Sequence, residues 1–134
     1  MKKIAIEVDG VAAEAELFDD LAPRATAALW AALPAEARLQ HSKWSGRACE
    51  LALPGLASAG GLEHPVCSIY PGTLVARPDR GEVLLSYGAA EYRSALGVEY
   101  ATRIGRLTGN ADALMAVLAQ MHDEGDKTIR IRRA

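Results

Sequence analysis

The sequence predicts a mainly β protein, built as a closed or half-closed antiparallel barrel of about eight strands with two capping helices. Apolar and polar side chains alternate in several short segments, which is the period of a half-buried strand. Only two segments carry helical spacing, one near each end of the chain, so strands and helices do not recur in βαβ units. In so short a chain, closing the sheet or covering it protects the many strand edges.

A single domain over residues 1–134 is expected, because half of the 134 residues are hydrophobic and a chain of this size builds a core without disulfides or metals.

The first two strands are the most clearly predicted elements of the chain. Ile4, Ile6 and Val8 alternate with polar neighbours, residues 11–17 do the same, and Asp9-Gly10 between them is a strong hairpin signal.

A helix is predicted over residues 21–33, with Asp19-Asp20 as its cap, Pro23 in its first turn and Pro34 as its stop. The middle of the chain then predicts strands over 47–53, 73–76, 82–87 and 98–107. The second and third of these form a hairpin through the turn 77–81. Long loops over 55–72 and 88–97 have the character of segments that border a site.

A second helix is predicted to begin at a capping Asn110 and to end at Gly125. Residues 127–133 then read as a terminal strand with its basic face toward solvent. The segment 105–110 lacks the spacing of a phosphate-binding loop and is interpreted as a turn and cap.

The charge balance excludes several classes of protein. Fifteen Lys and Arg against 17 Asp and Glu give a net charge of −2, so no nucleic-acid surface is expected. No apolar run approaches the ~20 residues that cross a bilayer, and charges interrupt the N-terminus before a signal-peptide core. With only Cys49 and Cys67 and no CxxC pair, we expect a soluble, cytoplasmic protein with reduced cysteines and no membrane partner.

The sequence also resembles known families. Residues 17–26 resemble the passage from the second strand to the first helix of cyclophilins. The segments 41–46 and 84–88, with Tyr92-Arg93 and Gly97, are similar to a bacterial family of uncharacterised proteins with a cyclophilin-like fold, and this similarity runs over nearly the whole chain. It implies an eight-stranded cyclophilin-like barrel with two capping helices and no established activity.

The chain departs from the prolyl isomerases among cyclophilins. Those enzymes carry a Phe-His-Arg string and a pocket rich in Phe, whereas residues 43–49 here read Lys-Trp-Ser-Gly-Arg-Ala-Cys and Phe18 is the one Phe. Prolyl isomerase activity is therefore not expected. Only Arg47 or Arg103 is available as a donor aimed at a prolyl amide.

Two groups of residues are candidates for chemistry. His41 and Trp44 lie between the first helix and the next strand, where His41 is either an acid–base group or an ordinary half-buried donor, and Trp44 is either core or a ligand platform. Tyrosines and arginines cluster around the loop 88–97, either as a ligand-facing rim or as loop packing with solvated charges. The candidate ligand-binding residues are His41, Trp44, Tyr87, Tyr92, Arg93 and Arg103.

No cofactor or metal is expected, because the three histidines lack the spacing that places two ligands on one face. We expect a binding module for a small carboxylate- or amide-bearing metabolite, or a peptide, in a groove edged by Trp44, Tyr87, Tyr92 and Arg93.

The alternative is an enzyme, a hydrolase or isomerase, acting on a small amide or carboxylic acid. His41 or Glu63 would be its base and Arg93 or Arg103 its clamp. A homo-oligomer, or a subunit that docks a partner, is a further possibility. If His41, Tyr87 and Arg93 lie on separate faces, both site hypotheses fail.

Overall fold

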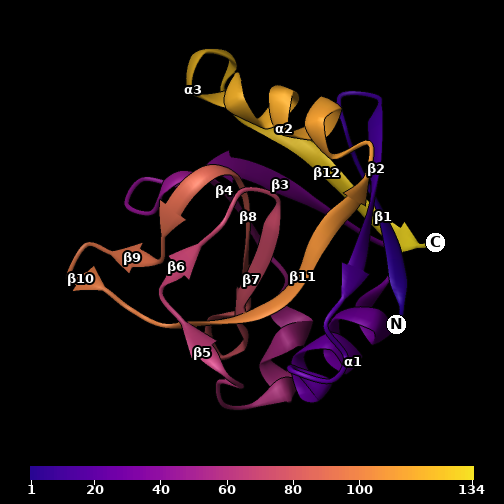
Figure 1. Cartoon of the computed structure of the whole chain (residues 1–134), viewed down its shortest axis with the longest axis vertical. Helices are drawn as coiled ribbons and strands as arrows, with labels where there is room; N and C mark the ends of the chain where they lie inside the picture. Colours follow the sequence, from indigo (N-terminus) through magenta and orange to yellow (C-terminus); the bar gives the residue numbers. More distant parts are fainter.

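The computed structural model describes residues 1–134 and contains a closed barrel of eight antiparallel strands (Figure 1). The strands follow one another around the barrel in the order β2, β1, β12, β3, β4, β8, β7 and β11, and β11 then pairs with β2. Their bounds are β1 (Lys3–Val8), β2 (Val11–Leu17), β3 (Ala35–His41), β4 (Gly46–Ala52), β7 (Thr73–Arg77), β8 (Glu82–Glu91), β11 (Ala101–Gly109) and β12 (Lys127–Arg133). The predicted fold class is confirmed, and the architecture is consistent with a cyclophilin-like barrel.

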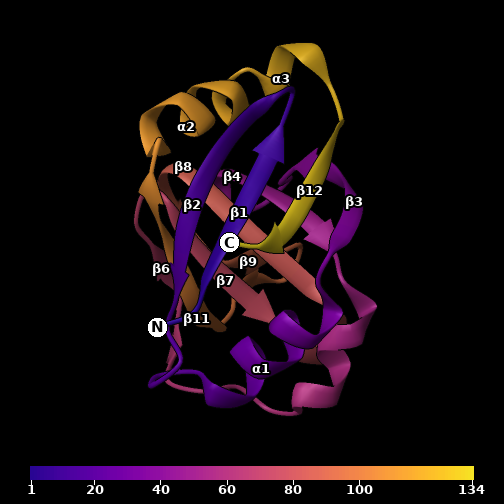
Figure 2. The same ribbon diagram turned by 90° about the vertical axis from the view of Figure 1, so that its right-hand side faces the viewer.

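The helices lie at the two ends of the barrel. The helix α1 (Pro23–Ala32) lies near one end, while α2 (Ala111–Ala119) and α3 (Met121–Glu124) lie over the other (Figures 1 and 2). Two short 3-10 helices, η1 (Pro54–Ala59) and η2 (Pro78–Arg80), complete the helical content. None of these helices combines the length and the apolar character that a membrane span requires.

The β1–β2 hairpin forms as predicted. Val8 pairs with Val11, and the two turn residues, Asp9 and Gly10, have φ values of 53° and 76°. A two-residue turn of this hand follows the twist of the flanking strands, and it needs residues that tolerate positive φ. Asp-Gly supplies them.

The predicted helix caps were wrong in their chemistry. Asp19 accepts a hydrogen bond from the backbone of Lys2 instead of capping α1, and Asn110 donates its side-chain amide to the carbonyl of Ala12. Neither residue caps the helix that follows it with a side-chain hydrogen bond. The cap of α1 comes from Glu63, whose carboxylate accepts from the backbone N–H groups of Arg24 and Ala25 at 3.1 and 2.9 Å.

The strand β3 was not predicted as a strand. Leu39 on this strand is buried, while Glu36, Arg38 and Gln40 are exposed, so the segment does alternate. Two of its inward positions are alanines, and alanine gives little apolar contrast to a charged neighbour. The periodic signal was present but weak.

The two long loops fold back over the outside of the barrel. They contain four two-residue strands, β5 (Pro65–Val66), β6 (Ser68–Ile69), β9 (Arg93–Ser94) and β10 (Gly97–Val98). The hairpin of β9 and β10 projects from the body of the barrel (Figure 1). Beneath these loops lies a second apolar cluster, separate from the barrel core, made by Ala48, Ile69, Val75, Leu84, Tyr92 and Ala101.

Candidate functional site

A cluster of three side chains, His41, Tyr87 and His122, lies at the end of the barrel that carries α3; we call it the His–Tyr cluster. The His41 Nε2 and the Tyr87 hydroxyl are 2.7 Å apart, and the His41 and His122 ring centroids are 3.6 Å apart. Strand register explains the first contact. Cys49 on β4 pairs with His41 on one side and with Leu85 on the other, and Tyr87 follows Leu85 by two residues on the same face of β8.

The hydrogen bonds of His41 define its neutral tautomer. Its Nδ1 lies 2.8 Å from the carbonyl oxygen of Ser42, which only accepts, so Nδ1 carries the hydrogen. Nε2 is then an acceptor, and the Tyr87 hydroxyl donates to it. Burial lowers the pKa of His41, and the neighbouring His122 lowers it further, against the opposing effect of the Ser42 hydrogen bond. Burial raises the pKa of Tyr87. Both side chains are therefore neutral at pH 7.

Arg47 lies beside this pair. Its side-chain carbons pass so close to Gly88, the residue after Tyr87, that a Cβ at Gly88 would lie 2.5 Å from the Arg47 Cδ. The positive charge of Arg47 acts on Tyr87, where it opposes the rise in pKa. Arg47 is exposed and makes no side-chain hydrogen bond or ion pair. Its guanidinium group is free to bind an acceptor from solution.

Cys49, the cysteine beneath the cluster, is buried and unreactive. Cys49 is fully buried, and burial raises the pKa of its thiol to about 12. Its sulfur lies 3.5 Å from the Met121 sulfur. A thiol with so high a pKa is not a nucleophile at neutral pH.

The turn that carries Trp44 lies against the backbone of Arg93, which is far away in the sequence. Trp44 is 54% exposed in the turn between β3 and β4, so of its two interpretations, core or ligand platform, the structure excludes the core. The next residue, Ser45, accepts a hydrogen bond through its hydroxyl from the backbone N–H of Arg93. The side chain of Arg93, however, is paired with Glu91 at 2.7 Å, so its charge is already neutralised.

Tyr92 does not edge an open groove, and here the predicted rim is corrected. Its ring is 2% exposed within the second apolar cluster, and its hydroxyl donates to Glu82 at 2.9 Å. The chain turns back over the barrel directly after β8, which carries the Tyr92 ring inward. Arg103 lies apart on β11, half-buried, with its Nε shielded from solvent and without an acceptor.

Glu63, the alternative base, has its carboxylate held at the start of α1, where it also lines a cavity with Arg24 and His64. It is 9% exposed, and both of its carboxylate oxygens are occupied by backbone N–H groups at the start of α1. Its own backbone N–H donates to the Thr102 hydroxyl. These contacts give Glu63 a structural role.

Three cavities lie elsewhere on the surface, and none is lined by any of the six candidate residues. One of about 300 Å³ holds Glu50 and Glu82, and burial together with the charge of Glu82 raises the pKa of Glu50. A second of about 300 Å³ lies by Arg24 and His64. The third is described below. No three His, Cys, Asp or Glu side chains converge as metal ligands.

Comparison with protein families gives one match, over residues 4–132, to a family described as "Protein of unknown function (DUF3830)". The chain belongs to the DUF3830 family. A search of curated proteins finds no match.

Two solved structures share the fold of this DUF3830 chain. McbB, solved in complex with tryptophan, superposes with a TM-score of 0.76 at 20% sequence identity, over 97% of this chain and 44% of McbB. The chain thus spans less than half the length of McbB. The hypothetical protein AF2241 from Archaeoglobus fulgidus superposes with a TM-score of 0.64 at 14% identity, over 99% of this chain and 95% of AF2241. At these identities the likeness is one of fold alone.

Sequence reasoning missed two members of the candidate site in this chain. His122 is one of the three histidines considered for metal-ligand spacing, and nothing in its local sequence places it against His41, because that contact depends on how α3 packs. Arg47 was considered only as a donor to a prolyl amide. The pairing of β4 with β8 is irregular between Gly46 and Ala48, so strand alternation alone does not report on which face Arg47 lies.

Proposed function

We propose that the protein binds a small carboxylate- or amide-bearing metabolite at the barrel end formed by the His–Tyr cluster and Arg47. The observation that carries this proposal is an arginine without a hydrogen bond or ion pair, Arg47, whose side-chain carbons lie against Gly88, the residue next to the hydrogen-bonded His41–Tyr87 pair. A guanidinium donates two parallel hydrogen bonds to a carboxylate or one to an amide oxygen. Exposed Trp44, in the turn that leads from His41 to Arg47, adds an apolar surface for the rest of the ligand.

The structural neighbour McbB supports this proposal in general terms. It was solved with tryptophan, a ligand that bears a carboxylate, and its fold resembles the one described here. A barrel of this architecture is therefore compatible with binding a small amino acid-like molecule.

A second candidate function is acid–base catalysis by the same pair on a small amide or carboxylic acid. It is favoured by the Ser42 hydrogen bond, which orients the imidazole, and by the lowered pKa, which keeps His41 in its base form. A positioned base of this kind serves general-base chemistry. In this function Arg47 binds the substrate, and a substrate proton passes to the Tyr87 oxygen as the Tyr87 hydroxyl proton passes to His41 Nε2, which leaves Tyr87 neutral and His41 protonated.

The test is a thermal-shift titration with matched pairs of small carboxylates and their amides, because a ligand that binds only the folded state raises the melting temperature. We expect a hit to lose about tenfold or more in affinity in Arg47→Gln, since a charge-assisted contact is lost. Arg106→Gln, on the outer face of β11, is the control and leaves affinity unchanged.

Two outcomes refute the proposal: no stabilisation by any member of the set, or equal stabilisation of the Arg47→Gln and wild-type proteins. Consumption of a stabilising ligand, lost in His41→Asn, distinguishes catalysis from binding.

A further inference from the structure

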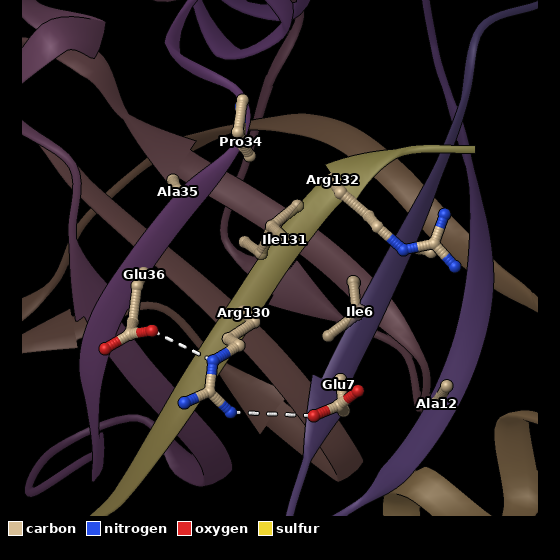
Figure 3. Close-up of a pocket in the computed structure, with 10 residues that line it drawn as sticks. Ile6, Glu7, Ala12, Pro34, Ala35, Glu36, Arg130, Ile131 and Arg132 are labelled. Carbon is tan, nitrogen blue, oxygen red and sulfur yellow. Dashed lines mark hydrogen bonds and ion pairs between the residues drawn. The ribbon is translucent and has the colours of Figure 1, made fainter.

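A hollow of about 400 Å³ lies on the outer face of the barrel, over β1, β12 and the start of β3, with Ala12 of β2 at its edge (Figure 3). We call it the outer hollow. These four strands run side by side, and no helix covers their outer face (Figure 2). None of the residues that line the outer hollow belongs to the His–Tyr cluster.

Short and long side chains on neighbouring strands create the hollow. Ile6 and Ile131 point into the core and are buried, so their strands present other residues outward. In register, Ala5 pairs with Arg132, while Glu7 pairs with Arg130 on one side and with Ala12 on the other. The alanines form a low apolar floor between tall charged walls, and Pro34 adds an apolar wall at one end.

The two arginines of the hollow differ in whether a carboxylate is paired with them. Arg130 is held between two carboxylates, with Glu36 at 2.9 Å and Glu7 at 3.6 Å. Arg132 forms no ion pair, and its one hydrogen bond is to the backbone carbonyl of Arg133 at 3.4 Å. Its side chain reaches across β1 toward β2, away from Arg130 (Figure 3). Arg132 is thus a free cation beside an apolar floor.

The structure assigns to the outer hollow the binding of a small monocarboxylate with a compact apolar body. Arg132 would bind the carboxylate through paired hydrogen bonds, and Ala5 and Ala12, on the two strands toward which Arg132 reaches, would contact the apolar body. The volume is that of a small-ligand site. Glu7 and Glu36 at the opposite side of the hollow disfavour ligands with a second negative charge, such as a dicarboxylate or a phosphate dianion. Because this site shares no residue with the barrel end, the inference is independent of the proposed function.

The experiment is an NMR titration of the ¹⁵N-labelled protein with benzoate, benzamide, acetate and phthalate. We expect benzoate to shift the amides of β1 and β12 around Ala5 and Arg132 in a saturable way. Benzamide lacks the charge and acetate lacks the apolar body, so each should bind about tenfold or more weakly. Phthalate should be weaker than benzoate because of its second carboxylate.

Three variants test the assignment. Arg132→Gln should weaken benzoate about tenfold or more, and Ala12→Leu should reduce binding by filling the floor. Arg106→Gln, an exposed arginine on β11 outside the hollow, is the matched control and should bind as the wild type. Arg132 and Ala12 are both exposed, and thermal unfolding verifies that each variant folds.

The inference is overturned if benzoate shifts no resonance in the hollow, if benzamide binds as well as benzoate, or if Arg132→Gln binds like the wild type. Shifts confined to the barrel end and abolished by Arg47→Gln would support the proposed function and overturn this inference. Shifts in the hollow that survive Arg47→Gln would support the inference alone.

Discussion

Replacing Glu63 should destabilise the protein through the start of α1. The Glu63→Ala variant removes both acceptors from the backbone N–H groups of Arg24 and Ala25, at a site where Ala25 is completely buried. Loss of a helix cap costs about 0.5–2 kcal/mol, and loss of a charged hydrogen bond costs about 1.5–3 kcal/mol. These contributions overlap, so we expect a net loss of about 2–3 kcal/mol in the free energy of unfolding.

For a chain of this length, that loss corresponds to a fall of about 6–10 °C in melting temperature. Urea unfolding followed by circular dichroism and by tryptophan fluorescence measures it. Glu63→Gln keeps one acceptor oxygen and should lose only about half as much stability. Glu14→Ala, an exposed glutamate without a hydrogen bond on β2, is the control. If Glu63→Ala unfolds within about 0.5 kcal/mol of Glu14→Ala, the capping role is wrong.

Three further predictions concern stability. The folded-state pKa of His41 is lowered below 6.5, so the neutral ring favours the folded state. Stability should therefore fall as the pH drops below 6.5, and His41→Asn should flatten that fall in thermal unfolding. The folded-state pKa of Glu50 is raised, so its contribution to the free energy of unfolding is most favourable at low pH and is lost as the pH rises through that pKa. The Glu50→Gln variant should therefore melt about 1–2 °C above wild type at pH 7 and lose this advantage below pH 4.5. Gly105→Ala would place a Cβ 2.5 Å from the carbonyl oxygen of Glu16, and chemical denaturation should show a loss of about 1–3 kcal/mol, whereas Gly61→Ala meets no atom within 4 Å and should be neutral.

Local chemistry made much of the barrel predictable. The β1–β2 hairpin follows from Asp9-Gly10, and β12 follows from its own alternation, because in both cases the deciding residues are neighbours in sequence. The strand β3 escaped prediction because alanines occupy its inward positions. The cap of α1 escaped because Glu63 lies 39 residues from Arg24, and no local pattern reports a contact of that range.

The candidate site was predictable only in part for the same reason. His41 and Tyr87 were both named from their residue types, but their contact spans 46 residues and depends on the register of three strands. Tyr92 was placed at the rim because tyrosines and arginines cluster around the loop 88–97. Its burial results from the turn after β8, which sets the ring against the outside of the barrel.

The position of β12 between β1 and β3 affects how the protein assembles. The β1–β2 hairpin has no neighbour beside β1 until β12, which lies far along the sequence, pairs with it, as the pairing of Ile4 with Arg133 shows. Contacts between such distant residues carry a large loop-closure entropy and slow the search for the native topology. Joining residue 134 to residue 1 through a short linker would shorten that search, so a circular permutant of residues 1–134 opened at the tip of the β9–β10 hairpin should fold faster than the same residues in their original order.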